Sequence, residues 1–230
     1  MKNKIWSPSD IEFTDRNYRQ NSKPQPTTKR LVDNDGEDFY PTPEWATAAL
    51  LAYETFTGNV WECACGDGAM AQVLKEKGID VVSTDLFDRG YGEPGVDFLK
   101  ADKLVDNIVT NPPYNLAGQF VTQGLRLAQK KLALLLRLAF LEGVERHQKI
   151  FAPTPPSRVW VFSERITFYP KNAEVKGSGT TAYAWFVWDK EATEAGQIGW
   201  IRPGLKKNKA GQVRGGANRQ DSQSETYLFP

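Results

Sequence analysis

Four consecutive residues, Asn111-Pro112-Pro113-Tyr114, carry the most specific chemical signal in this 230-residue sequence. They follow the apolar run DNIVT at 106–110, which predicts a strand ending at the carboxyl edge of a sheet, where α/β folds bind ligands. The two prolines restrict the backbone and remove two N–H donors, so the carbonyls before them are left to accept hydrogen bonds. An amide oxygen and a main-chain carbonyl can together receive both protons of an exocyclic amine, while the tyrosine ring stacks on a planar base.

A glycine-rich turn is the second candidate site. The segment ECACGDG at 62–68 lies between a predicted buried strand and a predicted helix. Glycines let a backbone pass close to a bound nucleotide, and a helix start offers unpaired N–H groups. Asp85 ends the next apolar run, seventeen residues after Gly68, near the spacing of about 20 expected for an acid that grips ribose hydroxyls. Gly66, Gly68 and Ala71 also satisfy the looser dinucleotide pattern G-x-G-x-x-A, so the turn alone leaves the cofactor open.

Composition limits the class of protein and of site. Lys and Arg number 29 against 28 Asp and Glu, and the net charge of +1 excludes a uniformly basic nucleic-acid coat, leaving only a local patch. A single histidine excludes a zinc site built on several imidazoles, and we predict no metal site. The two cysteines form no disulfide framework, and neither a signal peptide nor a full membrane span is visible. We expect a soluble cytoplasmic protein without a membrane partner.

Three regions are predicted along the chain. Residues 1–39 are polar and lack a period, which indicates an irregular arm, and residues 201–230 indicate a flexible basic tail. Between them, strands alternate with helices over 40–200, which predicts one domain with a mostly parallel sheet covered on both faces. The expected helices are one capped by Thr42 with Pro43 at its first position, one over 69–78 and one over about 117–130. The expected segments of the sheet are 59–64, 79–86, a short third one at 95–99, 106–110, 132–138, 158–163 and 182–189.

These motifs, in this order, resemble those of S-adenosylmethionine-dependent amino-methyltransferases, particularly the adenine-specific DNA methyltransferases of phage and prophage type. YPTP at 40–43 is similar to the family's first motif, WECACGDG at 61–68 to its cofactor loop, and NPPY to its catalytic tetrapeptide. LLRLAFLEG, FSERITFYP and YAWFVWDK resemble the later part of the phage-type members. The resemblance covers about Tyr40 to Trp200. It implies the class I methyltransferase fold, α/β and Rossmann-like, with a mostly parallel seven-stranded sheet and an antiparallel strand near its C-terminal end.

The resemblance also implies a site for S-adenosyl-L-methionine. Its cofactor-binding residues would be Tyr40, Thr42, Glu62, Ala64, Gly66, Gly68, Asp85, Leu86, Asp97 and Phe98. Thr42 would lie near the methionine end of the cofactor, and Asp97 and Phe98 would hold its adenine. Cys63 departs from the proline expected in the cofactor loop, which bears on the conformation of the loop and not on the presence of the site.

The implied reaction is methyl transfer to the exocyclic amine of adenine in DNA, with Asn111, Pro112, Pro113 and Tyr114 as the catalytic residues. Hydrogen bonds from the amine to Asn111 Oδ1 and the Pro112 carbonyl would favour a pyramidal nitrogen, whose lone pair then attacks the sulfonium methyl in line. The base would flip out of the duplex and stack on Tyr114. No enzyme nucleophile is needed, so both cysteines are interpreted as small structural residues.

The surface that contacts DNA is less closely defined. Six basic residues and no acidic one lie between Arg202 and Arg219, a segment that either follows phosphates or forms a solvated end. The expected nucleic-acid contacts are Arg165, Lys171, Lys176, Lys206 and Lys207. Since the domain leaves little room for a separate recognition domain, we expect a short or relaxed recognition sequence.

Other hypotheses remain open. The same fold could act on an amine in RNA or on the amide nitrogen of a protein glutamine, which an NPPY motif can also present. Gly66, Gly68 and Ala71 allow an NAD-dependent dehydrogenase, but that function leaves NPPY unexplained and lacks an obvious general acid. A catalytically silent DNA-binding protein would keep the fold, although intact Asn111 and Asp85 argue against decay of the site.

Overall fold

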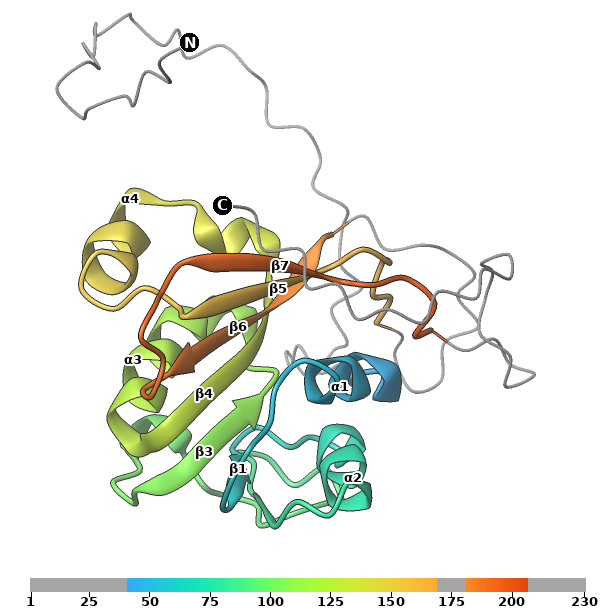
Figure 1. Cartoon of the computed structure of the whole chain (residues 1–230). Coiled ribbons are helices and arrows are strands. Elements are labelled where there is room, and N and C mark those ends of the chain that lie inside the picture. Colours follow the sequence, from blue (N-terminus) through green and yellow to red (C-terminus); the bar gives the residue numbers. More distant parts are fainter. Residues whose placement is uncertain (1–40, 169–180, 207–230) are drawn as a thin grey trace, which may run out of the picture. The chain divides into compact units, whose positions relative to one another are not determined.

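The computed structural model describes residues 41–168 and 181–206, and the strands in these ranges form one mixed sheet. Its order is β2-β1-β3-β4-β6-β5-β7 (Figure 1). The strands are β1 (Val60–Glu62), β2 (Val81–Ser83), β3 (Val105–Thr110), β4 (Ala128–Arg137), β5 (Arg158–Phe162), β6 (Tyr183–Asp189) and β7 (Gln197–Ile201). Among them only β6 runs antiparallel to its neighbours, β4 and β5. The predicted fold class, with an antiparallel strand near the C-terminal end, is confirmed.

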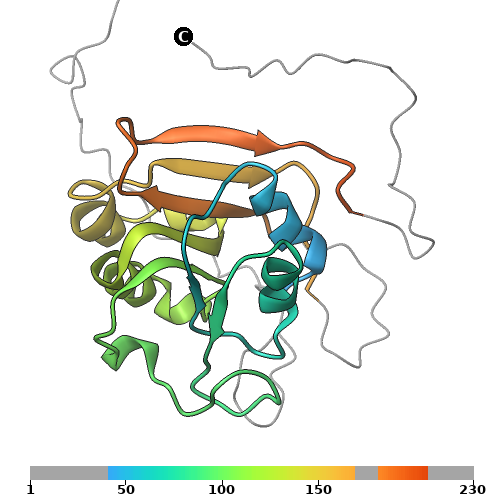
Figure 2. The ribbon, with the colours of Figure 1, turned by 60° about the horizontal axis from the view of Figure 1, so that its bottom comes forward.

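Helices cover both faces of the sheet, as two views show (Figure 1, Figure 2). One face carries α1 (Glu44–Leu51) and α2 (Ala69–Glu76), and the other carries α3 (Ala117–Leu127), the single turn α4 (Val144–Arg146) and the π-helical turn η5 (His147–Phe151). Because both faces are covered, β3, β4 and β6 are buried along most of their length. The third predicted helix ends at Leu127, earlier than expected, because β4 begins directly at Ala128.

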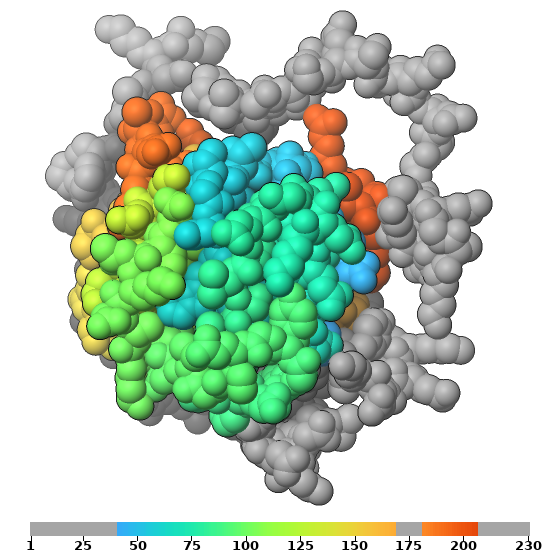
Figure 3. All heavy atoms as spheres, turned by 90° about the horizontal axis from the view of Figure 1, so that it is seen from below, coloured from blue at the N-terminus to red at the C-terminus, as the bar shows by residue number. Residues whose placement is uncertain are grey.

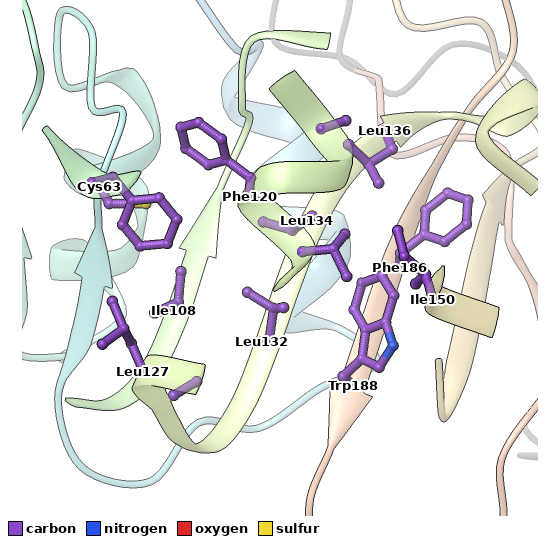
Figure 4. Packing of buried hydrophobic residues seen from close by; sticks show 14 of the residues in the cluster. Cys63, Ile108, Phe120, Leu127, Leu132, Leu134, Leu136, Ile150, Phe186 and Trp188 are labelled. Atoms are coloured by element: carbon purple, nitrogen blue, oxygen red, sulfur yellow. The ribbon is translucent and has the colours of Figure 1, made fainter. Parts of the chain in front are cut away.

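Alternate residues of the central strands feed two hydrophobic layers. On the α3 side, Leu134 packs in one cluster with Phe120 and Phe186 (Figure 4). On the α1 side, Trp185 is fully buried, and its Nε1 donates a hydrogen bond to the Ala46 carbonyl at 2.9 Å. Since neighbouring residues of a strand point to opposite faces, one apolar strand holds both layers, and the tryptophan fixes α1 against the sheet.

The segment at 95–99 is not a strand, so the expectation of a third sheet segment there is wrong. It leads into a 3₁₀ turn, η2 (Phe98–Lys100), in which the Asp97 carboxylate accepts a backbone N–H at 3.0 Å. The Phe98 ring is buried between those of Trp61 and Phe120, at centroid distances of 5.3 and 4.8 Å. A carboxylate cap and one buried ring stabilise a turn, whereas a strand would need a neighbouring backbone for its hydrogen bonds.

The seventh strand is β7, which the sequence pattern does not predict. It pairs in parallel with β5, and Gly199 lies opposite Trp160. A Cβ on Gly199 would lie 2.2 Å from the Trp160 ring, so the glycine gives that ring its space. A glycine in mid-strand and the exposed side chains of Ile198 and Trp200 give no buried apolar pattern, which explains why the strand is not recognised from the sequence.

All described strands except β6 end at one edge of the sheet, here called the carboxyl edge. Along it, the segments that follow β2, β1, β3 and β4 lie in that order, so Asp85, Gly66, Asn111 and Arg137 are placed in a row. At the β2 end of the sheet, the teal and green segments that run from α2 to the loop before β3 cover the surface (Figure 3). No helix within the described ranges is long and apolar enough to cross a membrane.

Candidate active site

Asn111 follows directly after β3, at the carboxyl edge. Its Nδ2 donates a hydrogen bond to Thr42 Oγ1 at 3.0 Å. Its Oδ1 is shut off from solvent and has no hydrogen-bond partner among the described residues. The contact with Thr42 orients the amide so that the nitrogen is paired and the oxygen is left as the unpaired acceptor. Because a buried acceptor without a partner is costly, this oxygen suits a ligand that brings a donor.

Thr42 does not cap α1, and that prediction is wrong. The N-cap residue is Pro43, and no side chain caps the helix. The Thr42 hydroxyl is instead turned to Asn111, and the residue is only 7% exposed. A proline at the N-cap leaves the threonine one position too early to reach the first N–H groups of the helix. Thr42 therefore links the start of α1 to the tetrapeptide after β3.

Tyr114 lies beside an aromatic and a cationic side chain. Pro112 is buried and Pro113 half-buried, and Tyr114 then begins the turn η3 (Tyr114–Leu116). The centroid of its ring lies 5.8 Å from that of Tyr183, and Arg137 Cζ lies over the ring at 4.7 Å from the centroid. Arg137 and Tyr183 are register partners on β4 and β6. The sheet therefore supports the tyrosine ring from β4, which neighbours β3, and from β6, which neighbours β4.

The glycine-rich turn between β1 and α2 takes a conformation that favours glycine. Gly66 and Gly68 have φ of +56° and +83°. The Gly66 N–H donates to Asp85 Oδ2 at 2.8 Å, which joins this turn to the segment after β2. A Cβ on Gly68 would lie 2.5 Å from the Tyr91 ring, so the ring packs directly on the glycine. Contacts with Asp85 and Tyr91 therefore hold the conformation of the turn within the protein itself.

Asp85 combines acceptor atoms with a neighbouring apolar surface. Its Oδ1 accepts the Phe87 N–H at 2.9 Å and lies 3.9 Å from Arg89 Nε, while its Oδ2 has the Gly66 N–H as donor. Each carboxylate oxygen has a further lone pair that can accept a hydrogen bond. Leu86 and Phe87 are apolar and yet 50% and 44% exposed. An acid that can accept hydroxyls, next to open apolar side chains, meets the needs of a nucleoside.

Glu62 is a buried acid at the end of β1. It is 2% exposed, and its Oε2 has no hydrogen-bond partner among the described residues. Burial raises the pKa of this carboxyl well above its ordinary value; the backbone N–H of Ala71 opposes the rise, and the charges of Asp85 and Asp67 add to it. A ligand cation would stabilise the ionised form, so Glu62 suits the ammonium of an amino acid.

The remaining predicted cofactor residues differ in what they offer. Ala64 lies in the turn that follows β1 and is half-buried against the core. Asp97 is partly exposed and pairs with Lys100 at 2.9 Å, which leaves its carboxylate near the surface. Phe98 is 3% exposed with its ring in the core, and its carbonyl already accepts a hydrogen bond from Gln123 Nε2 at 2.9 Å, so neither the ring nor the carbonyl is open to a ligand. Tyr40 lies outside the described residues.

The two cysteines are buried and close to the turn. Burial raises the pKa of the Cys63 thiol well above its ordinary value, and raises that of Cys65 to about 12. A thiol with a raised pKa is protonated near neutral pH and is a poor nucleophile. Both residues fit the structural role expected from the sequence.

Two of the predicted nucleic-acid contacts, Arg165 and Lys206, are described, and they lie together. Lys206 Nζ donates to the Arg165 carbonyl at 3.5 Å and lies 6.0 Å from the centroid of the Trp45 ring. They follow β5 and β7, which places them at the carboxyl edge with Asn111. The other predicted contacts, Lys171, Lys176 and Lys207, lie outside the described residues.

Arg137 belongs to the site although sequence analysis does not select it. It ends the apolar run LALLLR of β4, and its side chain lies over Tyr114. The signal in the sequence is a charged residue directly after the buried apolar run LALLL. The sequence does not reveal its proximity to Tyr114, because the two residues meet only through the pairing of β3 with β4.

The sheet order and the glycine-rich turn after β1 define the class I methyltransferase fold.

The sequence matches no protein-family model and no curated protein. Among solved structures, a modification subunit assigned to a type I restriction enzyme of Vibrio vulnificus YJ016 is 13% identical with a TM-score of 0.50, over 79% of this chain and 51% of the subunit, about half its length. Magnesium protoporphyrin IX methyltransferase of Synechocystis PCC 6803 is 16% identical with a TM-score of 0.43, over 63% of this chain and 76% of that enzyme. A protein assigned as an RNA methyltransferase of Pyrococcus horikoshii is 12% identical with a TM-score of 0.49, over 66% of this chain and 85% of that protein. These likenesses concern the fold.

Proposed function

We propose that this protein transfers a methyl group from S-adenosyl-L-methionine to the exocyclic amine of adenine in DNA. The observation that carries the proposal is the state of the Asn111 amide. Its nitrogen is held by Thr42 at 3.0 Å, and its buried oxygen has no partner among the described residues. An amide fixed in this way presents an acceptor to an amine, which is the role that the NPPY resemblance assigns to it.

The chain's own groups would prepare the amine for attack. Adenine's exocyclic nitrogen is a weak nucleophile because its lone pair is delocalised into the ring. Two hydrogen bonds, to Asn111 Oδ1 and the Pro112 carbonyl, favour a pyramidal nitrogen with a localised lone pair. Bound S-adenosylmethionine supplies an electrophilic methyl group on a sulfonium. Tyr114 would hold the flipped base by stacking, and the surplus proton of the methylated nitrogen would pass to water.

The residues near β1 and β2 fit this cofactor. The buried acid Glu62, with an oxygen that lacks a partner, suits the methionine ammonium. Asp85 has lone pairs left for ribose hydroxyls, and the exposed Leu86 and Phe87 side chains suit the face of an adenine. These groups lie on the β2 and β1 side of Asn111, so cofactor and substrate would approach the tetrapeptide from different sides.

A nucleic-acid substrate is supported by charge at the same edge. Arg165 and Lys206 lie together after β5 and β7, and cationic side chains beside a nucleotide pocket favour a phosphate backbone. DNA is preferred to RNA on the resemblance of the later segments to phage-type DNA enzymes. RNA and protein glutamine are therefore the alternatives that the experiment must separate.

The test uses the full chain and S-adenosylmethionine labelled in its methyl group. Unmethylated genomic DNA, total RNA and a mixture of unmodified proteins are offered separately, and the labelled products are hydrolysed and identified by chromatography. We expect label in N6-methyladenine from DNA. Label confined to RNA, protein or N4-methylcytosine would overturn the proposed substrate, and absence of label from every substrate would overturn the proposed reaction.

A further inference from the structure

Arg137 carries a positive charge that no described carboxylate compensates. The side chain is only partly exposed, and its Nε is shut off from solvent without a hydrogen-bond partner among the described residues. The ion pairs within the described ranges do not include it. Arg158, by contrast, is held by two carboxylates, of Glu54 at 2.5 Å and of Asp189 at 2.7 Å. Since a guanidinium has five donors and is costly to bury unpaired, the Arg137 environment suits an anionic ligand.

The order of the sheet indicates which ligand brings that anion. The proposed cofactor groups Asp85 and Glu62 follow β2 and end β1, Asn111 follows β3, and Arg137 ends β4. Arg137 therefore lies on the far side of Asn111 from the cofactor groups. An anion there belongs to the substrate and not to the carboxylate of the cofactor.

The contact of Arg137 with Tyr114 indicates which part of the substrate supplies the anion. Its Cζ lies 4.7 Å from the centroid of Tyr114, the ring proposed to stack on the flipped base. A guanidinium on an aromatic face keeps its N–H edge free for hydrogen bonds in its own plane. A nucleotide that places its base at Tyr114 brings its own phosphates into reach of that edge.

We propose that Arg137 binds a phosphate that flanks the target nucleotide and so helps to hold the nucleotide outside the duplex. This inference rests on the proposed function, because it takes a nucleic acid as the substrate. Arg137 would act as a substrate-binding residue that also supports the Tyr114 ring. A neutral side chain would lose the phosphate contact, whereas a lysine would keep the charge and lose the fork-shaped set of donors.

The experiment compares the full-length wild type with Arg137→Gln, Arg137→Lys and Arg126→Gln. Arg126 is a matched control, because it is an exposed arginine at the end of α3 whose guanidinium bonds the Ala101 carbonyl. Binding of a fluorescent DNA duplex is measured by anisotropy over a series of KCl concentrations, and methyl transfer is measured in parallel. Circular dichroism and thermal melting verify that each variant is folded.

For Arg137→Gln we expect DNA binding about tenfold weaker at low salt and a slope of log Kd against log[KCl] reduced by about one. Arg137→Lys should keep most of the slope, and Arg126→Gln should match the wild type. An unchanged slope in folded Arg137→Gln, or a wild type that does not bind DNA, would overturn the inference. A reduced slope in a protein that methylates no DNA would leave the phosphate contact standing and would overturn only the proposed function.

Discussion

Thr42 Oγ1 and Asn111 Nδ2 are joined by a hydrogen bond of 3.0 Å, although the two residues are 69 positions apart in the sequence. The bond links the start of α1 to the end of β3. It decides which end of the Asn111 amide remains open, since Oδ1 is the atom left without a partner among the described residues. The orientation of the proposed catalytic amide is therefore set by a residue outside the tetrapeptide.

Replacing Thr42 with valine tests this link. The variant keeps the shape of the side chain and removes the acceptor, so the Asn111 amide can rotate. We expect kcat to fall about tenfold, the equivalent of one hydrogen bond, with the thermal melting temperature little changed. Thr42→Ser, which keeps the hydroxyl, should retain most of the activity. A folded Thr42→Val enzyme with wild-type kcat would show that the bond does not orient the amide.

Glu62 predicts an unusual dependence of stability on pH. Burial, the largest cause, raises the pKa of its carboxyl well above 4.5 in the folded state. The folded protein therefore favours the protonated acid: this contribution to stability is full below pH 4.5 and is lost as the pH rises through the raised pKa. Denaturation at a series of pH values upward from 4.5 should show wild-type stability falling more steeply than that of Glu62→Gln. Equal slopes for the two proteins would contradict the raised pKa of the buried Glu62 carboxyl.

The same acid should couple cofactor binding to a proton. If the methionine ammonium binds beside Glu62, it favours the carboxylate and a proton is released. Calorimetry of S-adenosylmethionine binding in two buffers of different ionisation enthalpy measures that proton. Proton release by the wild type and none by Glu62→Gln is expected; identical buffer dependence would place the ammonium elsewhere.

Gly68 should tolerate no side chain. Alanine there would combine a φ of +83° with a Cβ 2.5 Å from the Tyr91 ring. We expect Gly68→Ala to destabilise the protein by about 1–3 kcal/mol and to weaken S-adenosylmethionine binding, both measured on purified protein. The double variant Gly68→Ala/Tyr91→Ala removes the collision and should recover part of the loss. No recovery would assign the whole effect to the backbone conformation.

A buried ionic cluster joins the segment that follows α1 to β4 and β5. Glu54 is 4% exposed, and its carboxylate forms ion pairs with Arg158 at 2.5 Å and Lys131 at 2.9 Å. It also accepts a hydrogen bond from Trp160 Nε1 at 2.9 Å. Burial tends to raise the pKa of Glu54, but the hydrogen bonds from Arg158, Trp160 and Lys131 outweigh it and the pKa is lowered. The cluster therefore stabilises the fold above pH 4.5, and this contribution is lost as the pH falls through the lowered pKa.

Arg158→Met would leave Glu54 buried with fewer partners. We expect a loss of about 3 kcal/mol in the free energy of unfolding at pH 7, measured by chemical denaturation. The loss should shrink at pH values low enough to protonate Glu54 in both proteins. A variant as stable as the wild type at pH 7 would show that the cluster contributes little.

The parts of the fold that the sequence predicts correctly are those whose pattern lies within one short stretch of the chain. An apolar run followed by NPPY places Asn111 at the end of β3, because strand and turn are adjacent in the chain. The 95–99 segment was harder, since Phe98 is buried by Trp61 and Phe120, which lie elsewhere in the sequence. β7 lacks a buried apolar pattern because Gly199 makes room for Trp160.

The candidate site divides in the same way. The sequence predicts Gly66 and Asp85 as separate site residues, and the 2.8 Å hydrogen bond between them depends on the pairing of β1 with β2. The sequence predicts that Thr42 caps a helix, because a single sequence cannot show that Asn111 lies within reach of its hydroxyl. Arg137 belongs to no sequence motif, and its candidate role follows from its position over the Tyr114 ring.

The most direct test of the account compares the wild type with Asn111→Ala in transfer of a labelled methyl group from S-adenosylmethionine to unmethylated DNA. Asn115→Ala is the matched control, since Asn115 is exposed and follows the tetrapeptide directly. We predict that Asn111→Ala loses at least about 100-fold in transfer to adenine and keeps wild-type cofactor affinity, while Asn115→Ala remains active. Transfer to adenine at the wild-type rate by folded Asn111→Ala would contradict the proposed role of the Asn111 amide.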